Sequence, residues 1–427
     1  MVDLLAKITS LCKRRGLVFP NSEIYGGIQG FYDYGPLGVE MKNNLKRLWW
    51  QEMTRRHANV VGIDGDIITH PRVWEASGHV TSFTDPLREC KQCHKRFRAD
   101  EVAAKCPECG GALTAAKQFN ILVETSLGVV EGEKRTAYLR GEACQNIYLN
   151  YQNVLDTMHL KLPFGIVQIG KAFRNEITPK QFLFRLREFE QWDLQWFAHP
   201  KEMDQWYEFW KQARMAWYQA LISQPKKIRF RQHAKNELAH YAQKAFDIEY
   251  QTPFGWKEWE GIHWRADWDL SRHGQFSGRD LAYTDQETGE RFLPHIVETS
   301  GGIDRTFLYL LFDAYRDQDK RVWLQLDPRV APYQVAVFPL LANKPALISQ
   351  AKALYDVLKI KYHVAWDDIG NIGKRYRRQD EVGTPWCVTV DFDTLKDKTV
   401  TVRDRDTMKQ IRLSLDKLQD YFENELG

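Results

Sequence analysis

The segment from Gly170 to Phe197 combines residue types that suit a nucleotide triphosphate. Two runs of alternating apolar and polar residues flank a short basic loop, and this pattern predicts a β-hairpin. Phe173-Arg174-Asn175-Glu176 ends the first run, and the second run carries Arg185, Arg187 and Phe189. Guanidinium forks bind phosphate oxygens, and an aromatic face can stack on a purine. We therefore predict a nucleotide site here; a surface hairpin with solvated charges is the alternative interpretation.

Strand periodicity adds a carboxylate to the same predicted site. The side chains of a strand alternate between its two faces, so Phe189, Gln191 and Asp193 would lie on one face. A stacking ring and a carboxylate would then line one pocket.

Four of the seven cysteines form two close pairs with the spacing of a zinc site. The pairs are Cys90-Lys91-Gln92-Cys93 and, after twelve further residues, Cys106-Pro107-Glu108-Cys109. Two such knuckles supply four thiolates for a tetrahedral zinc ion, which leaves no position for water and predicts a structural rather than a catalytic metal. Four free thiols are the alternative. The other cysteines are expected to be packed thiols: Cys12, Cys144 and Cys387.

The composition predicts a folded protein without a membrane segment. The chain has 427 residues, 43% of them hydrophobic and 27% charged, and two or three domains are expected. There is no long apolar run, and the N-terminal stretch is too polar for a signal peptide, so a cytoplasmic location is expected. The net charge of +4 is mild, and any nucleic-acid binding would depend on local basic patches.

Helices and strands must hold these groups in place. A glycine-rich segment (24–38) leads into a predicted helix over 39–57 with one apolar stripe. That helix could pack within its own subunit or at a dimer interface, and the pattern does not separate the two. A second helix, with a tryptophan-rich stripe for the core, is predicted over Met203–Ala220. Residues 292–315 are typical of a strand, a Gly-rich turn and an apolar helix.

The C-terminal part of the chain has a different pattern. Two prolines in 327–332 mark a predicted linker, and the strands and helices that alternate beyond it predict a small α/β domain with a mixed sheet. A basic cluster in this part lies close in sequence to aromatic residues: Lys374, Arg375, Arg377 and Arg378, with Trp366, Tyr376 and Trp386. Such a mixture suits single-stranded RNA, whereas a solvated helix face explains the cluster equally well.

Three stretches resemble the signature motifs of the class II aminoacyl-tRNA synthetases. Phe173-Arg174-Asn175-Glu176 with Phe189 resembles motif 2, Gly301-Gly302-Ile303-Asp304-Arg305 resembles motif 3, and Gly35-Pro36-Leu37-Gly38 with its long helix takes the place of motif 1. More specifically, the chain resembles the glycyl-tRNA synthetases of the homodimeric type over nearly its whole length. Further stretches that carry this resemblance are Ser22-Glu23-Ile24-Tyr25-Gly26-Gly27, Trp74-Glu75-Ala76-Ser77-Gly78-His79-Val80, Arg98-Ala99-Asp100 after the cysteine pairs, Tyr138-Leu139-Arg140 and Arg187-Glu188-Phe189-Glu190-Gln191.

The resemblance implies a two-part architecture. Residues 1–330 would form an α+β catalytic domain built on an antiparallel sheet, and residues 331–427 an α/β anticodon-binding domain. Within the catalytic domain, the resemblance implies a zinc-knuckle insertion at about 85–117 and an inter-motif insertion at about 198–290.

The implied activity is that of a ligase. Glycine and ATP would give glycyl-adenylate and pyrophosphate, and the glycyl group would then pass to the terminal ribose of tRNA(Gly). ATP would be a substrate, magnesium and structural zinc the bound metals, and a homodimer the assembly. Two alternatives are a non-catalytic nucleic-acid-binding protein of the polymerase accessory type on the same fold, and a synthetase for another small amino acid. The presence of Arg174, Glu176, Glu298 and Arg305 opposes the first, and the zinc pairs with the Trp74–His79 stretch oppose the second.

The resemblance also implies roles for single residues. Arg174 would hold the α-phosphate, Arg305 the γ-phosphate and Arg185 the phosphate tail, and Phe189 would stack on adenine. The implied catalytic residues are Arg174, Glu176 and Arg305, and the implied ATP-binding residues are Arg174, Asn175, Glu176, Phe184, Arg185, Phe189, Glu258, Trp259, Gly302 and Arg305. The implied glycine-binding residues are Arg98, Glu142, Glu190, Gln191, Asp193, Glu298 and Ser300. The implied metal ligands are Cys90, Cys93, Cys106 and Cys109 for zinc and Glu258 and Glu298 for magnesium, and the implied anticodon-binding residues are Arg375, Arg377 and Arg378.

Several positions near the predicted glycine site depart from the usual family pattern. Asp193 stands where the family usually has Glu, Gly141-Glu142-Ala143 where it commonly has Pro-Glu-Thr, and His263-Trp264 where it has Ala-Asn. The charged groups remain, but one carboxylate is a methylene shorter. These changes therefore bear on the affinity for glycine more than on the type of reaction.

Overall fold

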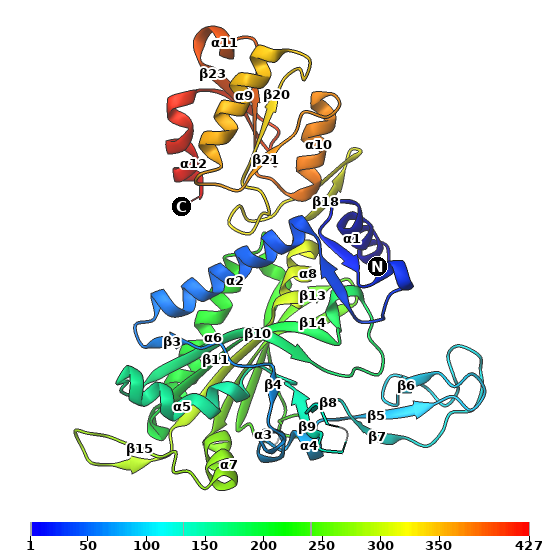
Figure 1. The fold of residues 1–427 in the computed structure, drawn as a ribbon, viewed down its shortest axis with the longest axis vertical. Coiled ribbons are helices and arrows are strands. Elements are labelled where there is room, and N and C mark those ends of the chain that lie inside the picture. The colour runs from blue at the N-terminus through cyan, green and yellow to red at the C-terminus, as the bar shows by residue number, and fades with distance from the viewer. Residues whose placement is uncertain (1, 131, 240, 427) are drawn as a thin grey trace.

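A computed structural model describes residues 2–130, 132–239 and 241–426 of the chain (Figure 1). A seven-stranded sheet forms the centre of the larger part of the molecule, with the strand order β12-β13-β14-β17-β11-β10-β3. The pair β10–β3 is parallel and the other pairs are antiparallel. The strands are β3 (Val60–Gly62), β10 (Phe164–Phe173), β11 (Glu188–Ala198), β12 (Ile228–Gln232), β13 (Lys244–Thr252), β14 (Gly255–Ala266) and β17 (His295–Gly302).

The hairpin predicted for 170–197 is confirmed as β10 and β11. The two strands pair from Phe164 opposite Phe197 to Phe173 opposite Glu188. On β11, the even-numbered residues from Trp192 to Ala198 belong to the main core, where Trp192 stacks on Trp49 at a ring distance of 5.7 Å. The odd-numbered residues therefore face the other side of the sheet.

Helices cover the two faces of the sheet unequally. On the face of Trp192, the large core forms with α1 (Val2–Arg14), α2 (Pro36–Arg56), α6 (Met203–Gln219) and α8 (Ile303–Ala314). On the other face, α5 (Gln145–Met158) and α7 (Trp268–Ser277) pack over one end through a smaller core that includes Tyr148, Phe197 and Leu270. The rest of that face is left open to a cavity.

The predicted helix over 39–57 corresponds to α2, for which packing within its own subunit and packing at a dimer interface were both open. Its apolar stripe is buried within its own subunit, since Met41, Leu45, Trp49 and Met53 all belong to the main core. Val39, on the same helix, is 40% exposed. A dimer contact through the exposed side of α2 stays a prediction.

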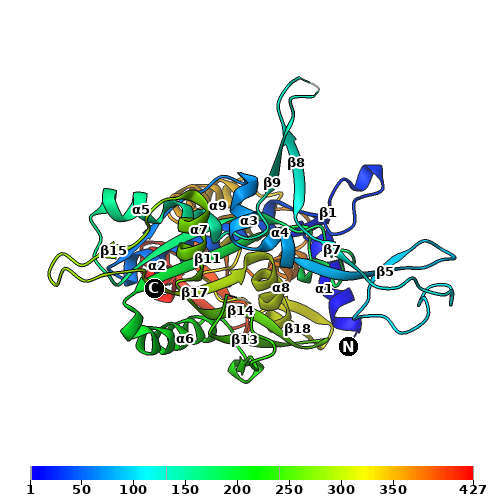
Figure 2. The same ribbon diagram turned by 90° about the horizontal axis from the view of Figure 1, so that it is seen from below.

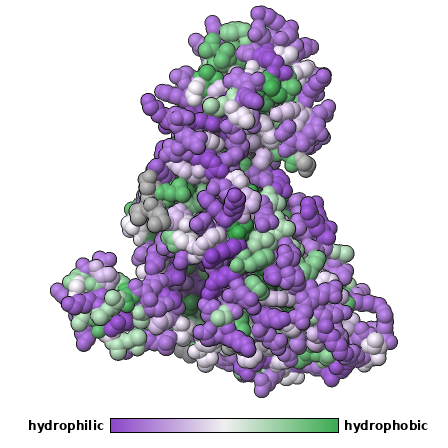
Figure 3. Space-filling view, turned by 180° about the vertical axis from the view of Figure 1, so that it is seen from behind, coloured by the Kyte–Doolittle hydropathy of each residue, from purple (hydrophilic) through white to green (hydrophobic). Residues whose placement is uncertain are grey.

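The segment with the cysteine pairs projects from the body as a separate lobe. Its three strands, β5 (Thr84–Glu89), β6 (Arg96–Arg98) and β7 (Lys117–Asn120), form one sheet in the order β6-β5-β7. Figure 2 shows this lobe and the hairpin of β8 (Val123–Leu127) and β9 (Arg135–Leu139) leaving the body in different directions. The lobe also stands apart at the lower left of Figure 3.

Residues 198–290, which the resemblance implied to be an inter-motif insertion, form part of the central sheet. They contain α6 and three strands of that sheet, β12, β13 and β14. Because β14 pairs directly with β17, this stretch also supplies residues that line the cavity.

The C-terminal part has the mixed sheet that the sequence predicted. Its strand order is β21-β20-β22-β23-β24, in which β20 pairs in parallel with β21 and β22 while β22–β23 and β23–β24 are antiparallel. This part lies above α1 and α2 in Figure 1. Its elements are β20 (Val335–Pro339), α9 (Pro345–Leu358), β21 (Val364–Trp366), α10 (Ile372–Val382), β22 (Trp386–Val390), α11 (Thr394–Asp397), β23 (Thr399–Asp404), β24 (Gln410–Ser414) and α12 (Leu418–Leu426).

None of the described helices has the length and apolar character needed to cross a membrane. Several short elements complete the description of the chain. These elements are β1 (Val18–Pro20), β2 (Tyr32–Tyr34), β4 (Ile68–Thr69), α3 (Pro71–Ala76), α4 (His79–Ser82), β15 (Tyr283–Thr284), β16 (Arg291–Phe292), β18 (Tyr315–Gln318) and β19 (Arg321–Leu324).

Candidate active site

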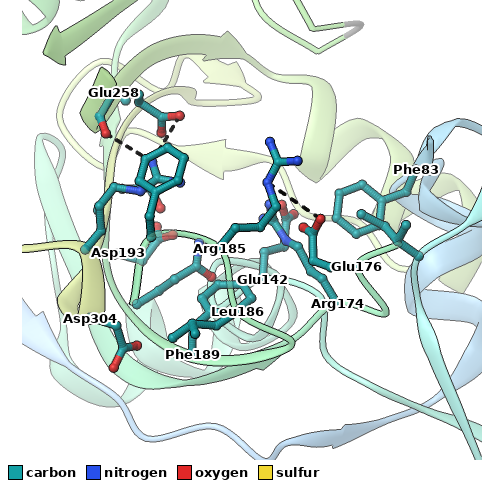
Figure 4. Close-up of a pocket in the computed structure, with 18 of the residues that line it drawn as sticks. Phe83, Glu142, Arg174, Glu176, Arg185, Leu186, Phe189, Asp193, Glu258 and Asp304 are labelled. Carbon is teal, nitrogen blue, oxygen red and sulfur yellow. Dashed lines mark hydrogen bonds and ion pairs between the residues drawn. The ribbon is translucent and has the colours of Figure 1, made fainter. Parts of the chain in front are cut away.

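A cavity of about 460 Å³ opens on the sheet face that α5 and α7 leave uncovered (Figure 4). Strands β11, β14 and β17 line it, together with the loop between β10 and β11 (174–187) and residues of β5 and β6 from the cysteine lobe. Most of the predicted substrate-binding residues line this one cavity: Arg98, Glu142, Arg174, Glu176, Phe184, Arg185, Phe189, Gln191, Asp193, Glu258, Glu298, Ser300, Gly302 and Arg305.

Two arginines reach the cavity from different elements. Arg174, just beyond β10, donates from Nε to the carbonyl oxygen of Gly141 at 3.0 Å, and its guanidinium lies 5.3 Å from the centre of the Phe189 ring. Arg305, in the first turn of α8, donates to the carbonyl oxygen of Glu258 at 3.1 Å and lies 3.3 Å from its carboxylate. Because these contacts use only part of each guanidinium, both side chains retain N–H donors for an anion.

A third arginine, Arg185, lies between two carboxylates. Its Nη1 donates to Glu101 of the cysteine lobe at 2.9 Å, and its Nε lies 3.9 Å from Oε2 of Glu176. Figure 4 shows Arg185 and Glu176 facing one another, with Arg174 next to them. Oε2 of Glu176 is buried and has no hydrogen-bond partner among the described residues, so it is an acceptor for a ligand donor.

The other end of the cavity is acidic and buried. Both oxygens of Glu298 are engaged: Nη1 of Arg265 donates to them at 3.1 and 3.0 Å, and Nδ1 of His263 lies 2.7 Å from Oε2. Burial opposes the charge of Glu298, but the Arg265 guanidinium and the His263 hydrogen bond outweigh it and lower its pKa to about 2. Glu298 is therefore ionised.

The pKa values of Asp193 and Glu142, at the same end, are shifted in opposite directions. Burial and the neighbouring charge of Glu298 raise the pKa of Asp193 well above its usual range. Burial also opposes the charge of Glu142, but His79, whose Nε2 lies 3.2 Å away, outweighs it and holds the pKa of Glu142 well below the usual value. The surroundings therefore favour the charged form of Glu142 and Glu298 and the neutral form of Asp193.

Three predicted substrate-binding residues lie outside this cavity, which corrects the sequence prediction for them. Glu190 points to the opposite face of β11, where its carboxylate pairs with Lys42 at 2.7 Å, because strand side chains alternate. Trp259 lies at a bulge of β14 and is fully buried, with Nε1 donating to Thr306 at 2.9 Å. Asn175 does not line the cavity, and its backbone N–H donates to the Ile121 carbonyl.

The sequence reasoning missed several residues that line or support the cavity. Tyr241 comes from the loop 233–243, which carries no recognisable motif, and His263 was noted only as a departure from a family pattern. Asp304 precedes Arg305 and accepts hydrogen bonds from Lys42 at 2.8 Å and from Tyr34 at 2.5 Å. The position of Asp304 within the Gly301–Arg305 stretch could have indicated that it lies at the site. No feature of the sequence indicated this for Tyr241.

The four paired cysteines are brought together in the projecting lobe. Their sulfur atoms all lie within 4.8 Å of one another, with Cys90 and Cys109 at 3.5 Å and Cys93 and Cys106 at 3.7 Å. Sulfur atoms bound tetrahedrally at about 2.3 Å from zinc are about 3.8 Å apart, so the spacing fits the ion. The backbone N–H of Cys93 lowers the pKa of the Cys90 thiol to about 6. This favours a thiolate, the form that binds a metal.

The predicted RNA-binding arginines of α10 divide between two faces of the helix. Arg375 is buried, and its guanidinium donates to the carbonyl oxygens of Pro339, Asp368 and Gly370, which corrects the prediction that it contacts RNA. Arg377, two residues on, keeps 65% of its side chain exposed. Arg378 is 30% exposed and forms a two-fold salt bridge with Asp367.

Comparison with known proteins agrees with this arrangement. Residues 128–314 match the family model described as the tRNA synthetase class II core domain (G, H, P, S and T), and residues 334–425 match the anticodon binding domain. The chain is 49% identical to the glycine–tRNA ligase of Treponema denticola, over 99% of this chain and 97% of that protein. It is 48% identical to the glycine–tRNA ligase of Borreliella burgdorferi, over 98% and 97% of the two chains. It is 47% identical to that of Thermobifida fusca, over 100% and 98%.

Proposed function

The chain belongs to the family of the glycine–tRNA ligases, and from that premise we propose how its residues carry out the reaction. In the first step, a glycine carboxylate oxygen attacks the α-phosphorus of ATP, which gives glycyl-adenylate and releases pyrophosphate. In the second, a ribose hydroxyl at the 3′-end of tRNA(Gly) attacks the glycyl carbonyl, and AMP leaves. The first step joins two anions, so it depends on positioning and charge neutralisation more than on acid–base chemistry.

The observation that carries this function is that one cavity is lined both by three arginines and by a buried cluster of carboxyl groups. Arg174, Arg185 and Arg305 suit a triphosphate, and Glu142, Asp193 and Glu298 suit an ammonium group. Glycine bound by its ammonium at the acidic end would direct its carboxylate towards the arginines. A non-catalytic nucleic-acid-binding protein, the alternative considered above, would not require this arrangement. The match to ligases over the whole chain also does not favour that alternative.

For the nucleotide, we propose the contacts that the family resemblance implies: Arg174 with the α-phosphate, Arg305 with the γ-phosphate and Phe189 stacked on adenine. All three residues line the cavity. Oε2 of Glu176 is buried and accepts no hydrogen bond from the described residues, and the exocyclic amine of adenine is a donor of the right kind for it.

Magnesium would neutralise charge on the ATP phosphates, and the two carboxylates implied as its ligands are not equally suited to hold it. Glu258 is the better ligand because its side chain is 51% exposed and its carboxylate lies beside Arg305, the residue assigned to the γ-phosphate. Glu298 fits poorly, since Arg265 and His263 already engage its oxygens. Magnesium also prefers to keep waters and phosphate oxygens among its ligands, which one carboxylate allows.

The glycine ammonium needs negative charge, which the three carboxyl groups supply unequally. The surroundings favour the ionised form of Glu142 and Glu298, and the positive charge of a bound ammonium would favour ionisation of Asp193 as well. Ser300 adds a hydroxyl beside them, and Gln191 is held by the backbone N–H of Ala143 at 3.1 Å.

The remaining parts of the chain support the second step. Cys90, Cys93, Cys106 and Cys109 would hold one structural zinc ion, which fixes the lobe that supplies Arg98 to the cavity wall. Residues from about 331 onward would read the anticodon, with Arg377 as the most exposed of the three predicted arginines. A homodimer, following the family type that the sequence resembles, and a cytoplasmic location, where tRNA is charged, complete the proposal.

The test is ATP–pyrophosphate exchange with a panel of amino acids, followed by charging of tRNA(Gly). We expect exchange to depend on glycine and Arg305→Ala to abolish it without loss of the fold, measured by circular dichroism. Exchange stimulated by another amino acid, or unchanged exchange in Arg305→Ala, would contradict the assignment.

A further inference from the structure

The acidic end of the cavity is closed by two rings that no part of the predicted site included. Tyr241 belongs to the loop 233–243 between β12 and β13, and His263 lies on β14; both line the cavity. Their ring centres are 6.2 Å apart and the rings meet edge to face. They therefore form one continuous wall rather than two separate contacts.

Tyr241 is held in this wall by the charge network of the acidic end. The guanidinium of Arg265 lies 3.7 Å from the centre of the Tyr241 ring, a cation–π contact. Arg265 is itself fixed, because it is buried and paired with Glu298 at 3.0 Å and with Asp269 at 2.7 Å. Tyr241 thus covers the cation that neutralises Glu298.

The loop that carries Tyr241 is tied to the sheet at both ends. The backbone N–H of His233 donates to the Ala245 carbonyl at 3.0 Å, and the backbone N–H of Gln243 donates to the Trp264 carbonyl at 2.8 Å. Tyr241 lies close to the second of these ties, which limits how far its ring can move away from Arg265.

His263 is fixed against the strand surface. Its Nδ1 lies 2.7 Å from Oε2 of Glu298, and the ring folds over Gly261, where a Cβ atom would lie 2.7 Å from Cε1 of the imidazole. The ring therefore occupies the space that a side chain at position 261 would take. The imidazole of His263 could move aside for a larger substrate only by losing its contact with Glu298.

We propose that Tyr241 and His263 set the size of the amino-acid end of the cavity and exclude substrates that carry a side chain. This inference rests on the proposed function and deepens it, because it names the residues that exclude alanine and serine from the site. A polar site binds any α-amino acid through its ammonium and carboxylate, so charge alone cannot select glycine. Selection by exclusion needs a rigid wall next to the ammonium, and the two rings meet that requirement.

The experiment compares kcat/KM for glycine and alanine in ATP–pyrophosphate exchange. Tyr241→Ala and His263→Ala should raise the ratio of alanine to glycine activation about tenfold or more, since one methyl group accounts for about 10–200-fold discrimination. Tyr241→Phe, which keeps the ring, should retain the wild-type ratio. Tyr355→Ala is the matched control, because Tyr355 lies in the C-terminal domain on α9, outside this cavity.

The outcomes separate the inference from the proposed function. If Tyr241→Ala and His263→Ala are folded and both keep the wild-type ratio, the inference is overturned while glycine activation by the wild type still stands. If the wild type shows no glycine-dependent exchange, both fall. If Tyr241→Ala does not fold, the ratio of alanine to glycine activation is measured in His263→Ala and Tyr241→Leu instead. A purely structural role of the two rings would leave this ratio unchanged.

Discussion

Glu101 of the cysteine lobe accepts a hydrogen bond of 2.9 Å from Arg185 in the loop between β10 and β11. The same carboxylate accepts a hydrogen bond from Lys180 of that loop at 2.5 Å. These contacts join the projecting lobe to the loop that covers the nucleotide end of the cavity. Lys180 and Arg185 are also paired with each other in an isolated β-bridge. Glu101 therefore binds both strands of the loop at the point where they lie side by side.

We predict that Glu101→Gln weakens ATP binding. Loss of the charge frees Arg185 and Lys180 from their common partner, so the loop no longer holds Arg185 towards the phosphates. A partly exposed ion pair contributes at most about 1 kcal/mol, which corresponds to about a fivefold rise in KM for ATP. The KM for glycine should change less, because the contact of Glu101 with Arg98, a residue implied to bind glycine, is longer, at 3.8 Å. Steady-state exchange at varied ATP and varied glycine measures both values.

Glu108→Gln is the matched control for Glu101. Glu108 lies in the same lobe and pairs with Lys95 at 2.8 Å, away from the loop. It should leave both KM values unchanged. A Glu101→Gln enzyme with a wild-type KM for ATP would show that the clamp does not position Arg185.

Asp193→Asn is predicted to stabilise the fold and to weaken glycine binding. Folding raises the pKa of Asp193 well above its usual value of about 3.9. An acid with a raised native pKa destabilises the fold increasingly as the pH rises from its unfolded pKa towards its native one. The asparagine removes this cost, so the gain in the free energy of unfolding, on the order of 1 kcal/mol, should be larger at pH 8 than at pH 5.

The same variant loses a charged partner for the ammonium. A hydrogen bond to a charged group contributes about 1.5–3 kcal/mol, so Kd for glycine should rise about tenfold or more. Urea unfolding at the two pH values and calorimetric titration with glycine measure the two effects. Asp204→Asn, at a carboxylate that is 79% exposed, serves as the control. A variant less stable than the wild type at pH 8 would mean that Asp193 is ionised in the native protein.

Much of the site could be predicted because local periodicity decides it. The alternation along β11 predicted that Phe189, Gln191 and Asp193 share a face, and all three line the cavity. The same rule places Glu190 on the other face, paired with Lys42. Glu190 was assigned to the glycine site from the family resemblance, whereas the alternation along the strand would have placed it on the other face.

The other residues that were placed wrongly have different causes. A bulge in β14 turns Trp259 into the core, and no feature of the sequence marks that bulge. On α10, Arg375 lies four and seven residues before the buried Gln379 and Val382, so the helical period alone would have placed it on the inner face. Tyr241 could not have been found, because a loop residue acquires its position only when its ends are fixed to the sheet.

Replacing Cys106 and Cys109 with Ser is predicted to release about one zinc ion per chain, since two thiolates cannot complete a tetrahedral site. Loss of the metal should loosen the lobe, and with it Arg98 and Glu101, so the KM for ATP should rise together with the loss of zinc. Elemental analysis and exchange kinetics measure the two effects. Cys12→Ala, at a buried cysteine outside the lobe, should keep its zinc. Unchanged metal content in the double variant would remove the zinc assignment.

Glu381→Gln is predicted to impair tRNA charging more than glycyl-adenylate formation. Glu381 lies on α10 of the C-terminal domain with a 2% exposed side chain, and it accepts hydrogen bonds from Arg15 at 2.7 Å and Arg14 at 3.1 Å, at the end of α1. Its other oxygen accepts one from Arg377 at 3.1 Å, an exposed residue of the proposed anticodon surface. One buried carboxylate thus joins the N-terminal helix to that surface.

Without this charge, the arginines of α1 lose their common partner and the C-terminal domain is held less firmly over the catalytic part. Breaking a buried charged contact costs about 3–5 kcal/mol when one partner is removed, and the neutral amide of glutamine should reduce that loss because it can still accept hydrogen bonds. We expect kcat/KM for tRNA to fall about tenfold or more, while exchange without tRNA stays near the wild-type rate, because the cavity lies in the other domain. Glu423→Gln, which removes the ion pair with Lys361 inside the C-terminal domain, should change neither rate. Equal losses in charging and in exchange would mean that Glu381 stabilises the whole chain rather than the placement of the tRNA-binding domain.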